Sequence, residues 1–325
     1  MHPSRAGPMN TLAVVIEQPE RLSLSALRLP TLQDDDVVVE VEYSGISTGT
    51  ERLIWNGTMP MFPGMGYPLV PGYEAVGRVM AVGPRSDNWI GQRVFVPGAR
   101  CFGEVRGLFG ASASRLVVPG GKVVPVDDKL GPQAVLLALA ATAYHSVAGG
   151  GQTAPHTPPD LIVGHGVLGR LLARMNVAAG ITDFTVWETN PVRQTGAEGY
   201  RVLHPHDDPR RDYGAIYDVS GDAGLLDTLI GRLAFGGEVV LAGFYAQPLS
   251  LSFAPAFMRE ARIRVAAEWK RPDMLAVNAL LHAGRLSLDG LLTHCEPADQ
   301  ASLAYHQAFS DAGCLKMVLD WRHHA

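Results

Sequence analysis

Short apolar runs separated by glycine and proline characterise the first third of the chain. Such runs are typical of strands bounded by turns. They predict strands at residues 12–16, 37–43, 73–82, 93–96 and 114–118. The pattern therefore indicates a β-rich, barrel-like domain over residues 1–130, and the polar, proline-containing residues 1–8 predict a loose extension in front of it.

Beyond residue 130 the pattern changes to alternating strands and helices. A helix at residues 133–147 and a glycine- and proline-rich break at 149–159 come first. We then expect strands at residues 160–163, 183–188, 215–219, 238–242 and 262–267, and helices at 168–179, 191–198 and 223–233. This alternation predicts βαβ units. Right-handed crossovers then give a doubly wound parallel sheet of the Rossmann kind over residues 131–270, so the fold class is α/β.

The last segment, residues 271–325, contains helical patterns at 272–282 and 298–308 and one apolar strand at 315–321. A strand needs a partner strand for its backbone hydrogen bonds, and this segment offers none. We therefore expect the segment to return to the N-terminal domain.

A glycine-rich turn follows the first strand of the second domain and opens the next helix. Its residues are Gly164, His, Gly166, Val167, Leu168 and Gly169. In this context the first glycine makes the tight turn, the second lets the backbone approach a pyrophosphate, and the third lets the helix pack against the strand. The helix start at Val167 and Leu168 adds amide donors and the positive end of the helix dipole. The turn predicts a dinucleotide-binding site.

Glu188 ends the next predicted strand, about 20 residues beyond the turn, where a carboxylate accepts hydrogen bonds from the adenosine ribose and repels a 2′-phosphate. This position predicts NAD rather than NADP as cofactor. Arg193 argues the other way, since a nearby arginine can neutralise such a phosphate. Ser220 and Gly243 follow later strands at the carboxyl edge of the sheet and are candidates for binding the nicotinamide half.

Composition narrows the classes of function. With 47% hydrophobic and 18% charged residues, the chain has the composition of a folded globular protein. Its formal net charge of −5 and the lack of a lysine- and arginine-rich block argue against nucleic-acid binding. The longest apolar run is too short to cross a bilayer, which predicts a cytoplasmic protein. The three separated cysteines, Cys101, Cys295 and Cys314, fit free thiols.

The order of a β-rich domain, a nucleotide domain and a C-terminal return resembles the medium-chain dehydrogenase/reductase superfamily, which implies a GroES-like catalytic domain. The segments around Ser47 and Tyr73 look like the two that carry catalytic zinc ligands in the alcohol dehydrogenases of this superfamily. Here Ser47 stands where those enzymes have cysteine, and Tyr73 where they have histidine. Hydroxyl and phenol groups are poor zinc ligands, and the four-cysteine structural zinc lobe is missing as well. We therefore expect a dehydrogenase without zinc.

Five runs of the chain resemble the bacteriochlorophyllide dehydrogenase family of bacteriochlorophyll biosynthesis more closely. They are residues 44–51, 63–74, 137–143, 161–172 and 314–322. The resemblance implies a tetrapyrrole substrate, a bacteriochlorophyllide, and NAD-linked oxidation of a 1-hydroxyethyl group on its macrocycle to an acetyl group. Resemblance to the superfamily also implies a homodimer.

Without zinc the protein itself must remove the hydroxyl proton, a general-base task that contributes about 10²–10⁴-fold. Tyr73 is the first candidate base because it occupies the lost histidine position beside Glu74, which we expect to orient its neighbours. Ser47 and Thr50 can relay the proton. His145 is the second candidate because histidine titrates near neutral pH. A structural role has equal weight for each residue. Tyr73 can be a phenol that only packs, and His145 can be a histidine whose hydrogen bonds are all made within the domain interface.

A large planar substrate needs an apolar slot with few polar groups. Aromatic and methionine side chains crowd the glycine- and proline-rich loop of the first domain, and four further aromatics can face it. The loop residues are Trp55, Met59, Met61, Phe62, Met65 and Tyr67, and the others are Phe102, Phe109, Phe244 and Tyr245. The alternative is a satellite core beneath a long loop.

Two other functions stay open at this point. One is a zinc-free quinone or enoyl reductase of the same superfamily. Such enzymes normally use NADPH, so Glu188 argues against this reading. The other is a nucleotide-binding or scaffold protein without catalysis that has lost its metal.

Overall fold

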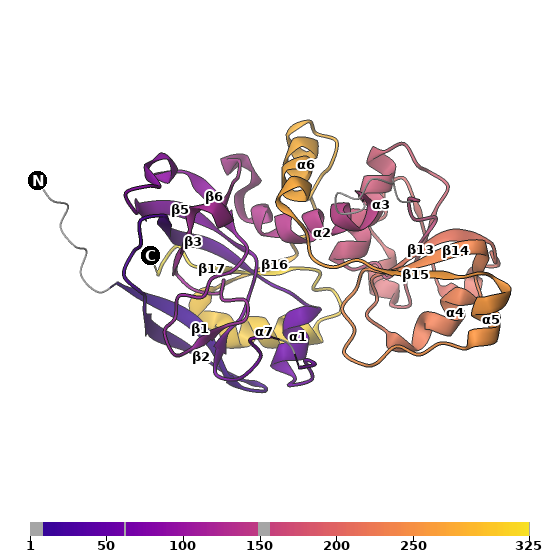
Figure 1. Ribbon diagram of the computed structural model, residues 1–325, viewed down its shortest axis with the longest axis horizontal. Coiled ribbons are helices and arrows are strands. Elements are labelled where there is room, and N and C mark those ends of the chain that lie inside the picture. Colours follow the sequence, from indigo (N-terminus) through magenta and orange to yellow (C-terminus); the bar gives the residue numbers. More distant parts are fainter. Residues whose placement is uncertain (1–8, 62, 149–156, 325) are drawn as a thin grey trace, which may run out of the picture. The chain divides into compact units, whose positions relative to one another are not determined.

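The computed structural model describes residues 9–61, 63–148 and 157–324 (Figure 1). The predicted extension at residues 1–8 and the loop residue Phe62 lie outside these ranges. The chain divides into two compact units: unit 1 comprises Met1–Leu136 and Leu292–Ala325, and unit 2 comprises Leu137–Leu291. The sequence pattern predicted that the second domain begins at residue 131 and ends at residue 270. In the structure, unit 2 begins at Leu137 and ends at Leu291.

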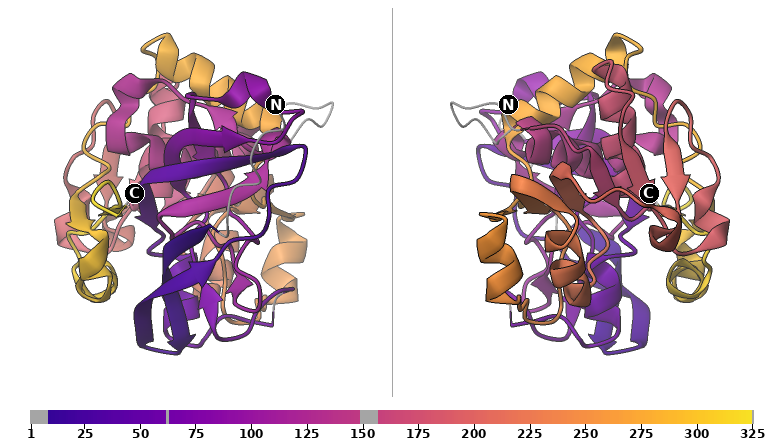
Figure 2. Two further views of the ribbon diagram at one scale, coloured as in Figure 1. Left: turned by 90° about the vertical axis from the view of Figure 1, so that its left-hand side faces the viewer. Right: turned by 90° about the vertical axis from the view of Figure 1, so that its right-hand side faces the viewer.

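Unit 1 is built from two sheets, which can be followed in Figure 2 (left). The larger has the order β16-β17-β3-β5-β6-β9, with β8 also paired to β3, and the smaller has the order β2-β1-β4-β7. The strands of the larger sheet are β3 (Asp36–Ile46), β5 (Ala75–Val82), β6 (Arg93–Val96), β8 (Arg115–Pro119), β9 (Val124–Pro125), β16 (His294–Pro297) and β17 (Met317–Asp320). Those of the smaller are β1 (Asn10–Gln18), β2 (Arg21–Arg28), β4 (Leu69–Val70) and β7 (Arg106–Gly107). The predicted β-rich N-terminal domain is confirmed.

Residues 292–325 return to unit 1, as expected, whereas residues 271–291, which were expected to return with them, belong to unit 2. Strand β17 pairs antiparallel with β3, and Leu319 lies opposite Ser44. Helix α7 (Ala301–Ser310) buries Ala304 and Tyr305 in the same hydrophobic core as the first strands. The last strand thus has a backbone partner on each side: β3 from the beginning of the chain, and β16 from its own segment, which was expected to offer no partner strand.

Unit 2 contains a six-stranded parallel sheet in the order β12-β11-β10-β13-β14-β15 (Figure 2, right). Its strands are β10 (Leu161–Val163), β11 (Thr185–Trp187), β12 (Arg201–Leu203), β13 (Tyr213–Asp218), β14 (Leu233–Leu241) and β15 (Arg262–Val265). Its helices are α2 (Leu137–Ala148), α3 (Val167–Ala178), α4 (Leu226–Ile230), α5 (Phe253–Met258) and α6 (Arg271–His282). Numbered along the unit, the order is 3-2-1-4-5-6, which is typical of dinucleotide-binding domains. The predicted doubly wound α/β sheet is confirmed, and its switch point lies between β10 and β13.

Several elements differ from the sequence-based expectations. Strands β2, β12 and β16 and helices α1 (Thr50–Trp55) and α5 were not predicted, because they are short or half-exposed and their apolar pattern is weak. The helix expected at 223–233 is a 3-10 turn followed by the five-residue α4, and Gly231 ends it. Tyr73 and Glu74, expected in a strand, precede β5. Among the described residues, no helix is long and apolar enough to span a membrane.

Candidate active site

The glycine turn lies between β10 and α3, as predicted. Gly164 has a φ of +104°, a left-handed conformation that favours glycine. A Cβ at Gly169 would lie 1.8 Å from the carbonyl oxygen of Gly164, so only glycine lets the helix approach the turn this closely. A Cβ at Gly166 would meet nothing within 4 Å. Open space therefore lies over the start of α3, where Val167 and Leu168 present amides without helix partners.

Glu188 directly follows β11, and its carboxylate lies against the glycine turn. The Oε2 atom accepts a hydrogen bond from the backbone N–H of His165 at 3.0 Å, and Oε1 accepts one from the N–H of Asn190 at 2.8 Å. Each oxygen keeps a lone pair for a further donor. The structure thus brings Glu188 beside the turn, while the half-buried Arg193 lies a few residues further on, in the 3-10 turn Pro191–Gln194.

The loops that follow β13 and β14 reach the same edge of the sheet. A Cβ at Gly164 would lie 3.4 Å from the Cα of Ser220, and one at Gly243 would lie 3.2 Å from the backbone nitrogen of Gly221. Ser220 is held by Asp218, whose Oδ1 accepts from the Ser220 N–H at 2.9 Å and from its hydroxyl at 2.6 Å. The loops that carry Ser220 and Gly243 therefore meet beside the glycine turn.

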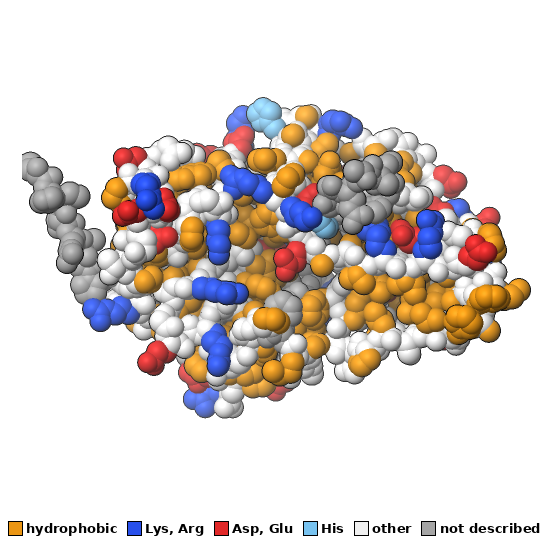
Figure 3. Space-filling view, viewed as in Figure 1, with side chains coloured by type: hydrophobic (Ala, Val, Ile, Leu, Met, Phe, Trp, Pro, Cys, Tyr) orange, Lys and Arg blue, Asp and Glu red, His pale blue; other side chains and the backbone are white. Residues whose placement is uncertain are grey.

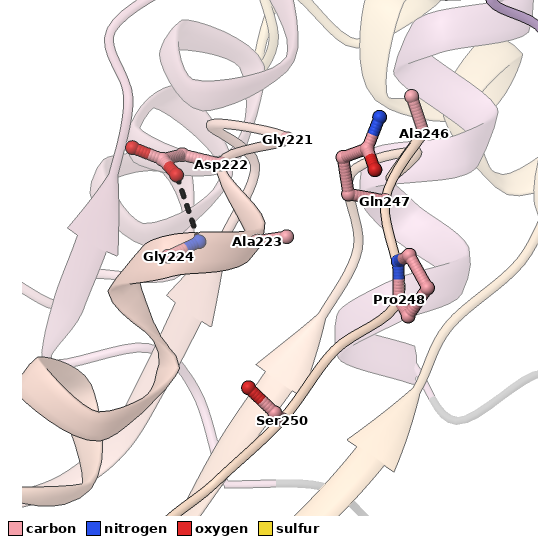
Figure 4. A pocket seen from close by; sticks show the side chains of 8 residues that line it. All are labelled: Gly221, Asp222, Ala223, Gly224, Ala246, Gln247, Pro248 and Ser250. Atoms are coloured by element: carbon pink, nitrogen blue, oxygen red, sulfur yellow. Dashed lines mark hydrogen bonds between the residues drawn. The ribbon is translucent and has the colours of Figure 1, made fainter.

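An open pocket of about 400 Å³ lies between two of these carboxyl-end loops. Figure 4 shows residues 221–224 on one side of it and the segment that contains Gln247, Pro248 and Ser250 on the other. The first side is stiffened by Asp222, whose Oδ1 accepts a hydrogen bond from the N–H of Gly224 at 2.8 Å. The pocket is formed next to the strand ends for which the sequence predicted the nicotinamide half.

In unit 1, Ser47 follows β3 and Tyr73 precedes β5, and their side chains meet. The phenol of Tyr73 donates a hydrogen bond to the Oγ of Ser47 at 2.7 Å. The side chain of Thr50, at the start of α1, lies close enough to the same phenol to oppose the rise of its pKa. The structure thus brings together three of the residues predicted for catalysis.

Glu74, the next residue, forms a buried ion pair with Lys316. The Nζ atom lies 2.7 Å from Oε2, and the two side chains are 1% and 0% exposed, respectively. A Cβ at residue 45 would lie 2.3 Å from this oxygen, so Gly45 leaves the room that the carboxylate occupies. The other oxygen, Oε1, is buried and has no hydrogen-bond partner among the described residues. A buried carboxylate oxygen without a donor is uncommon, and it is available to accept a proton.

Glu51, on α1, is the second buried carboxyl group of this cluster. Its Oε1 accepts from the backbone N–H of Ser47 at 3.0 Å, and its Oε2 accepts from the hydroxyl of Tyr305, on α7, at 2.7 Å. Burial raises the pKa of Glu51 to about 7, and the two hydrogen bonds oppose this only in part. Lys316 forms its ion pair with Glu74 rather than with Glu51. Glu51 therefore keeps its proton up to near neutral pH.

The same surroundings decide the charge of Tyr73. Burial of the phenol oxygen, followed by the charge of Glu74, raises the pKa of Tyr73, although part of the residue is exposed. The hydrogen bond to Ser47 does not offset this rise. The phenol therefore stays protonated across the ordinary pH range and donates hydrogen bonds, which disfavours the phenolate that a tyrosine base requires.

His145, the other predicted base, belongs to unit 2 and lies on α2. Its Nδ1 lies 2.8 Å from the Oδ2 of Asp273, on α6. The same carboxylate oxygen accepts from the backbone N–H of Lys270 at 2.7 Å. Since a carboxylate accepts, Nδ1 is the ring nitrogen that donates in this contact. The histidine is thus oriented by a carboxylate, and this contact also ties α6 to α2 within unit 2.

Comparison with known proteins identifies the family. Residues 33–128 match the alcohol dehydrogenase GroES-like domain. The chain is 55% identical to the 2-desacetyl-2-hydroxyethyl bacteriochlorophyllide A dehydrogenase of Rhodobacter capsulatus, over 97% of this chain and 99% of that protein. The protein of the same name from Cereibacter sphaeroides is 54% identical, over 97% and 99%. The chain belongs to the bacteriochlorophyllide dehydrogenase family. This family lies within the medium-chain dehydrogenase/reductase superfamily, as the resemblance in the sequence implied.

Solved structures share the fold of this bacteriochlorophyllide dehydrogenase family member at low sequence identity. An alcohol dehydrogenase from Escherichia coli, solved with NADH, matches with a TM-score of 0.80 at 21% identity, over 97% of this chain and 100% of that one. A dehydrogenase from Sinorhizobium meliloti, solved with NADP, matches with a TM-score of 0.76 at 20% identity, over 96% and 99%. The GroES-like and Rossmann fold class predicted from the sequence is confirmed.

The residues that this family member offers do not fit a catalytic zinc. The two predicted ligand positions carry the hydroxyl of Ser47 and the phenol of Tyr73, and these bond to each other at 2.7 Å. Zinc takes thiolate, imidazole or carboxylate ligands. Within the described ranges, no group of three or more His, Cys, Asp or Glu side chains is placed to hold a metal ion.

The apolar residues predicted to form a substrate slot have several different environments. Trp55, Met59 and Phe102 lie in the core of unit 1, and Trp55 packs against Tyr305 at 5.8 Å between ring centroids, so these side chains serve packing. Phe109 stands edge-on to Tyr73, with 5.5 Å between the ring centroids. Among the described slot candidates it is the one whose ring contacts Tyr73. The remaining described candidates are the partly buried Met65 and Tyr67, the exposed Met61 and Phe244, and Tyr245, which donates to Asp218.

Sequence reasoning missed several residues whose side chains bond within the site of unit 1 or within the site of unit 2. Lys316 carries a visible signal, because it is the single charge in the apolar run at residues 314–319. His165 and Arg170 are polar residues within the glycine turn and on the apolar face of α3, which is a similar signal. Glu51 and Tyr305 give no local signal, since they meet across 254 residues of chain.

Proposed function

We propose that this protein oxidises the hydroxyethyl group of a bacteriochlorophyllide to an acetyl group. The observation that carries the proposal is the identity of 55% over 97% of the chain to the Rhodobacter capsulatus dehydrogenase. A match of this extent spans both units, and it favours this reaction over a quinone or enoyl reductase. The name of that relative supplies the substrate class.

NAD is the proposed hydride acceptor. Glu188 supports it, since its carboxylate lies beside the glycine turn with lone pairs left for ribose hydroxyls and would repel a 2′-phosphate. The open space at Gly166 and the free amides at the start of α3 support a pyrophosphate there. The loops at Ser220 and Gly243 stay the proposed site of the nicotinamide half, where bound NAD would take up the hydride.

We propose that the hydroxyls of Tyr73 and Ser47 bind the carbinol oxygen and that Glu74, the residue next to Tyr73, is the base that takes up its proton. The unpartnered Oε1 of Glu74 and the protonated state of the Tyr73 phenol support this assignment. The carbinol carbon then loses its hydrogen with the bonding electron pair, and the C–O bond becomes the carbonyl of the acetyl group. This chemistry proceeds without zinc. His145, oriented by Asp273, is the alternative base.

The test is anaerobic incubation of the purified protein with NAD and 3-hydroxyethyl bacteriochlorophyllide a. We expect the long-wavelength absorbance band to shift to the red as the acetyl group forms, with NADP far less effective. No shift with a folded preparation that binds NAD would contradict the proposed reaction. Elemental analysis that finds one tightly bound zinc per chain, needed for activity, would contradict the zinc-free mechanism.

The proposed assembly is a homodimer in the cytoplasm. Support for the dimer comes from β15, an edge strand whose Val265 side chain is 72% exposed, and from the neighbouring Phe253, which is 74% exposed. Figure 3 shows hydrophobic side chains gathered over α5 and β15. Edge strands and large apolar patches are common sites of association. Light scattering should give twice the chain mass, and Val265→Lys should shift the protein to monomer.

A further inference from the structure

His165 projects from the glycine turn into a fully buried position beneath it. Its Nδ1 lies 2.6 Å from the carbonyl oxygen of Arg193, and its Nε2 lies 2.7 Å from the hydroxyl of Tyr200. A carbonyl only accepts, so Nδ1 carries the proton and Nε2 accepts from Tyr200. Burial lowers the pKa of His165 to about 4, which keeps the ring neutral at ordinary pH. The ring therefore links the turn to the chain segment that follows Glu188.

Arg170, on α3, reaches the same segment from the other side. Its side chain is buried, and its guanidinium donates to four carbonyl oxygens: to His165 at 3.1 Å, Arg193 at 3.1 Å, Thr195 at 2.8 Å and Gly196 at 3.3 Å. Gly196 has a φ of +77°, and a Cβ there would lie 2.6 Å from the guanidinium. The backbone at residues 193–196 is thus shaped around the arginine.

These bonds converge on residues 193–196, which we call the ribose loop because they follow Glu188. Gln194 closes the loop from within by donating to the carbonyl oxygen of Glu188 at 2.8 Å. The Arg193 carbonyl accepts from two donors, His165 and Arg170. The backbone that carries Arg193, the side chain able to neutralise a 2′-phosphate, is therefore fixed relative to both Glu188 and the glycine turn.

We propose that His165, Arg170 and Tyr200 are positioning residues for cofactor specificity. They hold the ribose loop in the conformation in which the Glu188 carboxylate faces the adenosine ribose and repels a 2′-phosphate. Binding NADP requires this loop to move, because the phosphate must replace the interaction of the ribose hydroxyl with the carboxylate. The three side chains oppose that movement without touching the cofactor. This inference rests on the proposed use of NAD.

The test measures the dissociation constants of NAD and NADP by calorimetry for the full-length protein and its variants. Arg170→Ala and His165→Phe should lower the preference for NAD over NADP by about tenfold, because NAD binding weakens while NADP binding is unchanged or tighter. Tyr200→Phe, which removes a single hydroxyl, should lower it by about threefold. Thermal melts establish that each variant is folded.

Arg174→Ala is the matched control. Arg174 lies one turn further along α3, and its guanidinium donates to the carbonyl oxygens of Ser287 and Asp289, both at 2.8 Å, rather than to the ribose loop. It should keep the wild-type preference. Arg170→Lys separates charge from geometry, since a lysine keeps the charge but cannot bond several carbonyls in a plane. It should lose the preference as Arg170→Ala does.

Equal weakening of NAD and NADP in the Arg170 and His165 variants would overturn the proposal, since that pattern marks general support of the fold. A wild-type preference in Arg170→Lys would also overturn it. If Arg170→Ala and His165→Phe fail to fold, Tyr200→Phe decides. A wild-type protein that binds neither cofactor overturns this inference together with the proposed function, whereas altered preference without turnover of the bacteriochlorophyllide upholds the inference alone.

Discussion

The candidate site in unit 1 consists of side chains from distant parts of the chain, whereas the site in unit 2 consists mainly of backbone from one contiguous turn. Glu74 and Lys316 meet across 242 residues at 2.7 Å, while Gly164, Gly166 and Gly169 are neighbours in sequence. Side chains can be exchanged without changing the fold, and the resemblance to the alcohol dehydrogenases implies that Ser47 and Tyr73 stand where those enzymes carry metal ligands. A glycine turn cannot vary in this way, because its geometry excludes any Cβ at Gly169. The side chains of unit 1 can therefore change by single exchanges, whereas the glycine turn of unit 2 is fixed by its backbone geometry.

The largest expected effect concerns the ion pair of unit 1. Lys316→Met leaves the carboxylate of Glu74 buried and unpaired, so the free energy of unfolding should fall by about 3–5 kcal/mol at pH 7. Urea denaturation measures this loss. The double variant Glu74→Gln/Lys316→Met buries no charge at this position and should recover much of the stability. A double variant as unstable as Lys316→Met would show that lost packing, not charge, is responsible.

The second prediction separates the candidate bases. Glu74→Gln should lower kcat by about 10²–10⁴-fold, the contribution of a general base. Tyr73→Phe should lower it by about tenfold or less, since it removes one neutral hydrogen bond. His145→Ala serves as the comparison from unit 2 and should also stay within about tenfold. A larger loss in His145→Ala than in Glu74→Gln would assign the base to unit 2 instead.

The third prediction uses the raised pKa of Glu51. Below pH 4.5 this group is protonated in both the unfolded and the folded protein, and between 4.5 and about 7 it is protonated in the folded protein alone. Its contribution to stability is therefore complete at low pH and is lost as the pH rises to about 7, by about 2–3 kcal/mol. Glu51→Gln does not titrate, so the difference in unfolding free energy between wild type and variant should change over this window. A constant difference from pH 4.5 to 8 would contradict the raised pKa.

The smallest expected effect on stability distinguishes two glycines of unit 2. Gly169→Ala should lower the free energy of unfolding by about 1–3 kcal/mol, because its Cβ collides with the Gly164 carbonyl. Gly166→Ala should leave stability within about 0.5 kcal/mol of wild type, yet weaken NAD binding by about tenfold or more, because the methyl group occupies the space proposed for the pyrophosphate. Calorimetry of both variants tests this. Unchanged NAD binding in Gly166→Ala would place the pyrophosphate elsewhere.

The geometry of the glycine turn and of Glu188 could be predicted from the sequence. The glycine turn, Glu188 and the order of strands and helices are local or periodic signals, and the structure places the glycines and the carboxylate together. In unit 1 the candidate residues Ser47, Thr50, Tyr73 and Glu74 were found because their two segments resemble those that carry zinc ligands in the alcohol dehydrogenases. The sequence could not predict that burial keeps the phenol protonated, since desolvation depends on what packs around a group.

The sequence by itself determined the α/β fold class, the two-part organisation, the dinucleotide turn and the family, because periodicity and short motifs are written in neighbouring residues. Only the tertiary structure decided which charges are paired. It pairs Lys316 with Glu74 and lets Tyr305 donate a hydrogen bond to Glu51. It also places the carbonyl groups of the ribose loop around the guanidinium of Arg170. The pKa and the partner of a buried group depend on residues hundreds of positions away, and no local pattern records them.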